Sequence, residues 1–256
     1  MSAWVLRCMH GVAAGRECQG NIAAVHSDEF PPAPGPHTQV LLQRREHDWR
    51  VSARDPRGAA IRFCGHGALA AARVALDQAG PGSPHAGTLR FSSAAQQWRG
   101  RQDAGADRVT LSFARPALNL CDVPRAAARW LGVTPVAAAT SGAADDYLVL
   151  EVAAPASVAA AEPDAAAIGA ATRRALILTA LGPTGPVFRY FAPQYGDSED
   201  SATGSAAVQL GSYWRDRAGL EAADYVQLSP GGGCMTVHCN LAEVELSARV
   251  EYGAAA

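Results

Sequence analysis

The chain has 256 residues, of which 48% are hydrophobic and 18% charged, enough for one large domain or two small ones with cores of their own. The formal net charge is −2 and no long run of like charge occurs, which argues against nucleic acid or an anionic membrane as partner. A mean hydropathy of −0.03 excludes both a disordered chain and a membrane protein.

Lysine does not occur in the sequence, and the 22 residues counted as lysine or arginine are all arginines. Without lysine the chain cannot hold pyridoxal phosphate as a Schiff base or act as a lysine aldolase. It also cannot form the phosphate-binding loop that ends in Gly-Lys-Ser/Thr. Every mechanism that needs a catalytic amine from lysine is thereby excluded.

The first half of the chain is predicted to consist of short strands around one helix. The segment Pro31–Pro36 must be a loop, because proline fits neither a helix interior nor a central strand. An alanine-rich segment follows Cys64-Gly65-His66-Gly67 and ends at Gly80, which predicts a helix. Apolar runs and alternating patterns predict strands at residues 4–10, 21–25, 40–42, 49–53, 89–92, 97–99 and 109–113.

The second half repeats this mixture of elements. Helices are predicted at residues 124–131 and 155–171, and after the segment Ser201–Ser205, where Leu210, Tyr213 and Trp214 share one helix face. Gly219 is expected to end this last helix, and residues 192–200 to form a loop. Strands are predicted at residues 147–152, 176–179, 187–191, 225–228, 235–238 and 244–250.

The sequence contains six cysteines, and its N-terminal segment lacks the apolar core of a signal peptide. We therefore expect reduced thiols and a cytoplasmic location. Cys234, His238 and Cys239 lie close together, but a further ligand pair at zinc-finger spacing is missing. We interpret these three as ordinary strand residues and expect no metal site.

Each half has a similar segment at the start of its long helix. Cys64-Gly65-His66 and Thr203-Gly204-Ser205 are 139 residues apart, too long a period for a solenoid and suitable for a duplicated half. A helix start carries unpaired N–H groups and a partial positive charge, so two facing starts would bind a carboxylate and favour a thiolate at Cys64. Such segments are also common as tight turns and caps, and the residues alone leave both readings open.

Three segments resemble motifs of the phenazine-biosynthesis isomerase-like (PhzF-like) family. Residues 64–72, CGHGALAAA, are similar to the family's (C/A)GHATLAAA. Residues 191–193, FAP, followed by residues 199–206, EDSATGSA, are similar to FAP…EDPATGSA, and residues 20–25, GNIAAV, resemble GNPVAVV. The three occur in the family's order across nearly the whole chain.

The resemblance implies an α+β fold similar to that of diaminopimelate epimerase and proline racemase. Each of two similar halves would be a curled, barrel-like sheet around a central helix, with residues 1–115 and 244–256 in the first half and 116–243 in the second. The site would lie between the halves, where both helices begin. The implied activity is cofactor-independent removal and return of a proton next to a carboxylate, by a homodimer.

The chain departs from the family pattern at two places. The isomerases have a glutamate just before the strand at Val40–Leu42, where this chain reads Gly35–Gln39, and Glu46 is the next glutamate along the chain. Racemases of this fold need two cysteines, whereas this chain has Cys64 at the first position and Thr203 at the second. A threonine hydroxyl is a poor base, so a two-thiol racemase is disfavoured.

The interpretation that fits best is an isomerase with one base. Cys64, or alternatively His37 or Asp200, would take a proton α or γ to a carboxylate, and backbone N–H groups would bind the developing enolate. His66 and Asp200 would orient or relay the proton. The residues expected to bind the substrate are Asn21, Gly65, Gly67, Thr203, Gly204 and Ser205.

Three other activities stay open. A one-cysteine dehydratase or lyase would act on a hydroxylated amino acid, a non-catalytic member would only bind a small carboxylate, and a thiol hydrolase or transferase would use Cys64 as nucleophile. By resemblance, the substrate would be a small amino- or hydroxy-acid metabolite of secondary metabolism. Arg62, Arg189, Trp49 and the loop Asp28–Thr38 are further candidates for contact with it.

Overall fold

The computed structural model describes residues 3–80, 87–103, 107–142, 146–196 and 198–253. Its helices are α1 (Gly65–Ala79), α2 (Ala127–Leu131), α3 (Pro155–Ala159), α4 (Ala165–Ala171), the short 3-10 turn at Pro193–Tyr195 and α5 (Gly204–Ala218). Its strands are β1 (Ala3–Cys8), β2 (Gly11–Ala13), β3 (Arg16–Cys18), β4 (Asn21–His26), β5 (Thr38–Arg44), β6 (Trp49–Arg54), β7 (Ala60–Ile61), β8 (Leu89–Ser92), β9 (Gln97–Gln102), β10 (Arg108–Ala114), β11 (Leu118–Cys121), β12 (Ala137–Ser141), β13 (Tyr147–Glu151), β14 (Ala175–Gly182), β15 (Gly185–Phe191), β16 (Ala222–Gln227), β17 (Gly233–Cys239) and β18 (Glu243–Tyr252).

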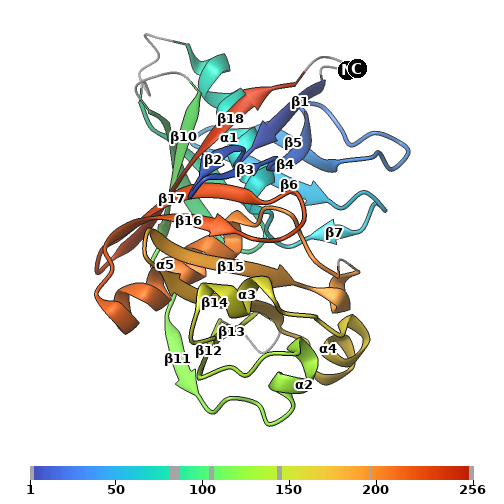
Figure 1. Cartoon of the computed structure of the whole chain (residues 1–256). Helices are drawn as coiled ribbons and strands as arrows, with labels where there is room; N and C mark the ends of the chain where they lie inside the picture. The colour runs from blue at the N-terminus through green and yellow to red at the C-terminus, as the bar shows by residue number, and fades with distance from the viewer. Residues whose placement is uncertain (1–2, 81–86, 104–106, 143–145, 197, 254–256) are drawn as a thin grey trace.

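One continuous sheet joins the two halves of the molecule (Figure 1). Its strand order is β1-β4-β5-β6-β8-β9-β10-β18-β17-β16-β15-β14-β13-β12-β11. An additional pairing of β1 with β18 closes the first eight strands into a ring, and β2 pairs with β3 as a separate hairpin. Strand β18 therefore pairs with β1 and β10 of the first half, while it also pairs with β17. The division at residues 115/116 and 243/244 stays a prediction.

A long buried helix runs through each half. Helices α1 and α5 have 15 residues each, and their ends keep the predicted offset of 139 residues. Helix α1 packs against β1, β4, β5, β9 and β10, and α5 against β17, β18 and β11. The many alanines of α1 are buried on all sides, because a helix inside a closed ring of strands must be thin enough to fit.

The two central helices meet at their N-terminal ends. A β-carbon on Gly65 would lie 2.5 Å from the amide nitrogen of Ser205 and 2.8 Å from Cα of Gly204. A β-carbon on Gly204 would lie 2.8 Å from Cδ2 of Leu246 in β18. The helix starts are thus in backbone contact, and only glycine leaves room for that approach.

Several predicted elements differ from the structure. The helix predicted at residues 155–171 is two short helices, because Pro163 cannot continue a helix and the amides of Glu162 and Asp164 instead donate to carbonyls at the end of α2. The helix predicted at 124–131 forms only at Ala127–Leu131. The first strand ends at Cys8, since Met9 takes a left-handed φ of 61°.

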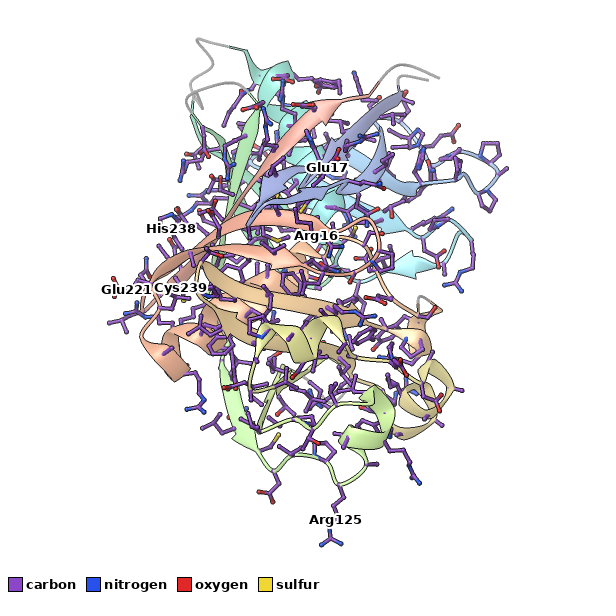
Figure 2. The ribbon with its side chains drawn as sticks, viewed as in Figure 1. Arg16, Glu17, Arg125, Glu221, His238 and Cys239 are labelled. Carbon is purple, nitrogen blue, oxygen red and sulfur yellow. The ribbon has the colours of Figure 1, made fainter. Side chains whose placement is uncertain are left out.

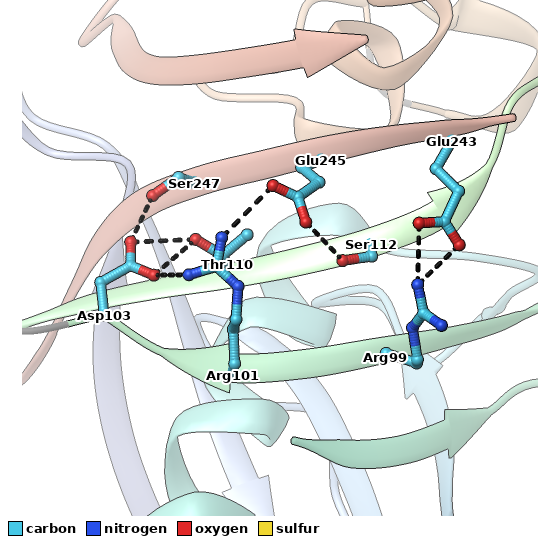
Figure 3. Close-up of polar contacts among 8 residues, drawn as sticks. All are labelled: Arg99, Arg101, Asp103, Thr110, Ser112, Glu243, Glu245 and Ser247. Carbon is cyan, nitrogen blue, oxygen red and sulfur yellow. Dashed lines mark hydrogen bonds and ion pairs between the residues drawn. The ribbon is translucent and has the colours of Figure 1, made fainter. Parts of the chain in front are cut away.

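Polar side chains cover the outer face of the sheet near the join between the halves (Figure 3). Arg99 forms an ion pair with Glu243 at 2.6 Å, and Arg101 bridges Asp103 at 2.5 Å and Glu245 at 3.3 Å. Three hydroxyls of β10 and β18, those of Thr110, Ser112 and Ser247, donate to the same two carboxylates of Asp103 and Glu245. These contacts tie β9, β10 and β18 together on the side away from α1. No helix among the described residues is long and apolar enough to cross a membrane.

Replacing Gly65 by alanine is expected to lower the free energy of unfolding by about 1–3 kcal/mol, because the new methyl group collides with the backbone of α5. Denaturant titration measures the change. Gly169→Ala is the matched control, since its β-carbon meets only ordinary contacts of 3.7–3.8 Å in α4 and alanine favours a helix. Equal stability of the two variants would show that the helix starts are not in contact.

Candidate active site

Cys64 caps the start of α1. Its backbone is extended (φ −119°, ψ 111°), and its sulfur accepts a hydrogen bond from the amide of Gly67 at 3.3 Å. Nδ1 of the buried His66 lies 3.5 Å from the same sulfur. A β-carbon on Gly67 would lie 3.1 Å from the sulfur and 2.9 Å from Val40 Cγ2, so glycine is needed there as well. Thiol and imidazole therefore form a contact pair at one helix start.

Asp200 provides the carboxyl group at the other helix start. The hydroxyl of Thr203 donates to Oδ2 at 2.5 Å, and the amide side chain of Asn21 donates to Oδ1 at 2.7 Å. Burial raises the pKa of Asp200 to about 6, although these two donors and the amides of Ser201 and Ala202 act in the opposite direction. Asn21, from the first half, is thereby joined to the carboxyl group of the second half.

Gln227 holds the backbone of this cluster in place, and the sequence analysis did not single it out. Its side chain is fully buried; Oε1 accepts from the amide of Thr203 at 2.6 Å, and Nε2 donates to the carbonyl of Asp200. Nε2 also lies 3.2 Å from Oγ1 of Thr203 and 3.1 Å from Oγ of the buried Ser229. The one available signal was a glutamine inside an apolar strand, since a buried amide needs partners for all its polar atoms.

Ser205, in the first turn of α5, is also buried and forms a hydrogen bond with the phenol of Tyr147 in β13. Burial raises the pKa of Tyr147 to about 12, so the phenol is neutral at physiological pH. Arg62 contributes a positive charge near this phenol, while its guanidinium pairs with Asp146 at 3.3 Å. Tyr147 is a second residue of this region that the sequence patterns did not single out.

The N–H groups at the two helix starts are the hydrogen-bond donors that the site offers to a negatively charged group. The side chain of Thr203 occupies the cap position of α5 without capping it, because its hydroxyl is engaged by Asp200. At α1 the cap is the sulfur of Cys64, which takes the amide of Gly67. Two positive helix ends in contact form a place where a carboxylate or enolate is favoured.

His37, an alternative base, lies just before β5. The parallel register of β4 and β5 pairs Ala23 with Thr38, which puts His37 at the same sheet edge as Asn21. Its carbonyl accepts from the side chain of Gln39 at 2.9 Å. The position of His37 is thus compatible with that of the glutamate that this chain lacks. Among the described interactions, His37 has no contact to Cys64 or Asp200.

Glu46 and Trp49 lie away from this site. Both line a hollow of about 670 Å³ together with Gln78 and Ala79, at the opposite end of α1 from Cys64. A helix of 15 residues is about 22 Å long, so Glu46 cannot replace the missing glutamate and Trp49 cannot contact a substrate at the helix starts. A second hollow, of about 530 Å³, lies over β9, β10 and β18.

Arg189 is also excluded from substrate contact. Its guanidinium pairs with Glu199 through two hydrogen bonds of 2.7 and 2.8 Å and donates to the carbonyl of Ala161 at 2.6 Å. Both charged side chains are largely buried, so the pair fixes the loop before Asp200 to β15. Among the described residues, no group of three or more histidine, cysteine or acidic side chains is arranged to hold a metal ion, and Cys234, His238 and Cys239 lie in β17.

A protein-family model, that of the phenazine biosynthesis-like proteins (PhzC-PhzF), matches residues 48–250. Two proteins of Pseudomonas aeruginosa, each named an uncharacterized isomerase, are similar to the chain. One is 31% identical over 68% of this chain and 64% of its own length, and the other is 34% identical over 76% and 71%. A 64-residue segment is 52% identical to an uncharacterized isomerase of Vibrio cholerae and covers 23% of it. The chain thus spans less than two thirds of the Vibrio cholerae protein and of the first Pseudomonas aeruginosa protein.

Solved structures show the fold. A PhzF-family protein of Enterococcus faecalis superposes with a TM-score of 0.81 at 22% identity, over 98% of this chain and 96% of its own. A hydroxyproline epimerase of Agrobacterium vitis, solved with trans-4-hydroxy-L-proline, superposes with a TM-score of 0.61 at 13% identity, over 98% and 91%. The predicted α+β fold of the diaminopimelate epimerase type is therefore confirmed.

Replacing Thr203 by valine is expected to raise the pKa of Asp200 above about 6, because the carboxylate loses its closest hydrogen-bond donor and stays buried. A pH titration of the carboxyl carbon by NMR measures the shift, and the missing signal in Asp200→Asn assigns it. Ser112→Ala, which removes a hydroxyl from the outer face of the sheet, should leave the titration unchanged. An unchanged or lowered pKa in the Thr203 variant would contradict the assigned hydrogen bond.

Proposed function

The chain belongs to the phenazine biosynthesis-like (PhzC-PhzF) family, and we propose that it is an isomerase that removes and returns a proton next to the carboxylate of a small amino or hydroxy acid. The observation that carries the proposal is the backbone contact between the starts of α1 and α5, with Cys64 on one and Asp200 beside the other. The relatives named isomerases in Pseudomonas aeruginosa support the reaction class.

The substrate carboxylate would bind at the joined helix starts. The backbone amides of Gly65 and Gly204 offer donors there, and the hydroxyl of Ser205 is held in place by Tyr147. When a proton leaves the neighbouring carbon, negative charge moves onto the carboxylate as an enolate. Donors that are already oriented stabilise that charge without reorganisation, which is the largest contribution that such a site can make.

Cys64 would act as the base. Its sulfur already accepts the amide hydrogen of Gly67, an interaction that strengthens when the sulfur is a thiolate. His66, 3.5 Å away, would orient the sulfur or relay its proton, and Asp200 would return a proton from the other helix start. Base and acid then stand on different halves, so a double bond could move along the substrate between them.

The second helix start does not supply a matching base. The hydroxyl of Thr203 donates to Asp200 and lies 3.2 Å from Nε2 of Gln227, which holds it in a structural role. A reaction with a thiol on each side of the carbon is therefore not available. One base and one acid favour isomerisation of a double bond or a tautomer over racemisation.

Elimination of water is a second candidate, favoured by the environment of Asp200. A carboxyl group whose pKa is about 6 keeps part of its protons near neutral pH and can protonate a departing hydroxyl group. The chain would then be a dehydratase of a hydroxylated amino acid, with Cys64 still removing the α-proton. A 2-oxo acid or an alkene among the products identifies this reaction.

The remaining features of the proposal follow from the family resemblance. The proton transfer would need no cofactor, since the base, the acid and the enolate donors all come from the chain. The active molecule would be a homodimer in the cytoplasm, acting on a metabolite of a biosynthetic route.

Cys64→Ala is expected to slow exchange of a carbon-bound proton at least about 100-fold, because the base is removed. The assay incubates a panel of small 2-amino and 2-hydroxy acids with the protein in deuterium oxide and follows the signals by proton NMR. Cys121→Ser, which changes an exposed thiol in β11, is the matched control and should exchange at the wild-type rate.

Three results would overturn the proposal. Full exchange by Cys64→Ala would assign the base to another residue, and His37→Ala and Asp200→Asn would then be tested in its place. A covalent adduct on Cys64 without any exchange would instead indicate a hydrolase or transferase. Binding of carboxylates without exchange by the wild-type protein would indicate a non-catalytic member of the family.

A further inference from the structure

The β2–β3 hairpin covers the outer face of β17, and this contact joins two cysteines that the proposed reaction does not use. Strand β2 of the hairpin contacts β17, and Figure 2 labels Arg16 and Glu17 of the neighbouring strand β3. Arg16 donates to the carbonyl of Ser229 at 3.1 Å, and the amide of Cys234 donates to the carbonyl of Met9 at 2.9 Å. The hairpin is thus held on both sides of the position at which Cys234 lies.

The register of the hairpin directs Cys18 toward Cys234. Gly11 pairs with Cys18 across the hairpin, so the two residues share one face. A β-carbon on Gly11 would lie 3.3 Å from the sulfur of Cys234, which places that sulfur directly under this face. On the opposite face, Val12 and Glu17 point to solvent. The thiol of Cys18 accordingly interacts with the sulfur of Cys234, and it also contacts the carbonyl of Arg16 at 4.0 Å.

The two thiols differ in their surroundings. Cys18 is 2% exposed, whereas Cys234 is only partly buried, because it lies with Thr236 and His238 on the outer side of β17. The hydrogen bond from Cys18 lowers the pKa of Cys234 to about 7, helped by Arg108 and Arg249 and opposed by burial and Asp224. The same contact and burial raise the pKa of Cys18. One sulfur is therefore suited to be a nucleophile and the other to remain a thiol.

We propose that Cys18 and Cys234 form a peroxide-sensitive thiol pair that oxidises to a disulfide between the hairpin and β17. The site is separate from the helix starts, where Cys64 lies, and the proposal does not depend on the activity proposed above. It assigns a modification site to a surface hairpin whose strands had no counterpart among the predicted elements.

The oxidation proceeds in two balanced steps with hydrogen peroxide as oxidant. The thiolate of Cys234 attacks a peroxide oxygen, an S–O bond forms, the O–O bond breaks and hydroxide leaves. Cys18 then loses its proton and attacks the sulfenic sulfur of Cys234, so that an S–S bond forms and the S–O bond breaks. The departing hydroxide and the Cys18 proton combine as water. The two thiols have lost two electrons, and the peroxide has gained them.

The expected consequence is a more firmly attached hairpin. The amides of Gln19 and Gly20 already donate to the carbonyls of Gly231 and Gly232, at 2.7 and 2.9 Å. A covalent bond beside them closes a long loop of the chain, which restricts the unfolded state. Oxidation should therefore raise the melting temperature by roughly 4–10 °C, and thiol reductant should reverse the shift.

The test treats the full-length reduced protein with hydrogen peroxide, alkylates the remaining thiols and maps the peptides by mass spectrometry. The expected product is a cross-linked peptide pair that contains Cys18 and Cys234, lost again on reduction. In Cys18→Ser, Cys234 should accumulate as a sulfenic acid that dimedone traps. In Cys234→Ser, Cys18 should stay reduced. The matched control Cys121→Ser, which removes an exposed thiol, should still form the cross-link.

Three results would overturn the proposal, and none of them needs a variant. In the first result, Cys18 and Cys234 of the wild-type protein remain reduced while the exposed Cys121 is oxidised. In the second, Cys234 pairs with a different cysteine. Either pattern excludes the assigned pair. Oxidation of Cys234 to the sulfinic acid, with Cys18 still free, would likewise show that the two sulfurs do not meet.

Discussion

The contact between the backbones of two helix starts is the constraint on which the rest of this molecule depends. Gly65 and Gly204 approach so closely that neither position has room for a side chain. Because each helix is enclosed by the strands of its own half, this contact fixes how the two halves sit against each other. It also brings together the positive ends of two helices, which in most proteins are separately capped or hydrated. Fold and anion binding thus have the same cause.

A network of buried polar groups extends this constraint across the join. Gln227 fixes the backbone at Asp200 and Thr203, Thr203 and Asn21 fix the carboxyl group of Asp200, and Asn21 comes from the other half. Every bond in this set orients a group beside the helix starts. A buried network that is fully satisfied specifies one arrangement, because each partner that moves leaves another without a hydrogen bond. The same burial that holds Asp200 raises its pKa, so structural and chemical roles coincide in one residue.

The sheet serves the site in a different way in each half. In the first, β1 and β18 close a ring around α1, and in the second an open sheet curls until α5 contacts both β17 and β11. Strand β18 belongs to both, and Leu246 on it packs against Gly204. The polar ladder of Arg99, Arg101, Asp103 and their partners strengthens this same junction from outside. The hairpin with Cys18 is attached close to this junction, because Gln19 directly follows Cys18 and Asn21 begins the next strand, β4.

Most strands and both long helices could be predicted from the sequence, because each depends on a local pattern: alternation, an apolar run, or glycine and alanine at a helix start. The prediction of one helix at 155–171 was wrong. The alanines of this segment favour a helix, but Pro163 and the pairing of its neighbours with α2 interrupt it. The motifs likewise identified Cys64, His66, Asp200, Thr203 and Ser205, since these lie within a few residues of the helix starts.

The sequence by itself determined the two helix starts, their spacing of 139 residues and the single thiol among them. Only the tertiary structure decided which groups join them. It brought in Gln227 and Tyr147, joined the predicted Asn21 to Asp200, bound Arg189 to Glu199, and set Cys18 against Cys234. The physical reason is that a helix start is encoded by neighbouring residues, whereas a hydrogen bond or thiol contact across the fold depends on strand pairing between residues far apart in the chain.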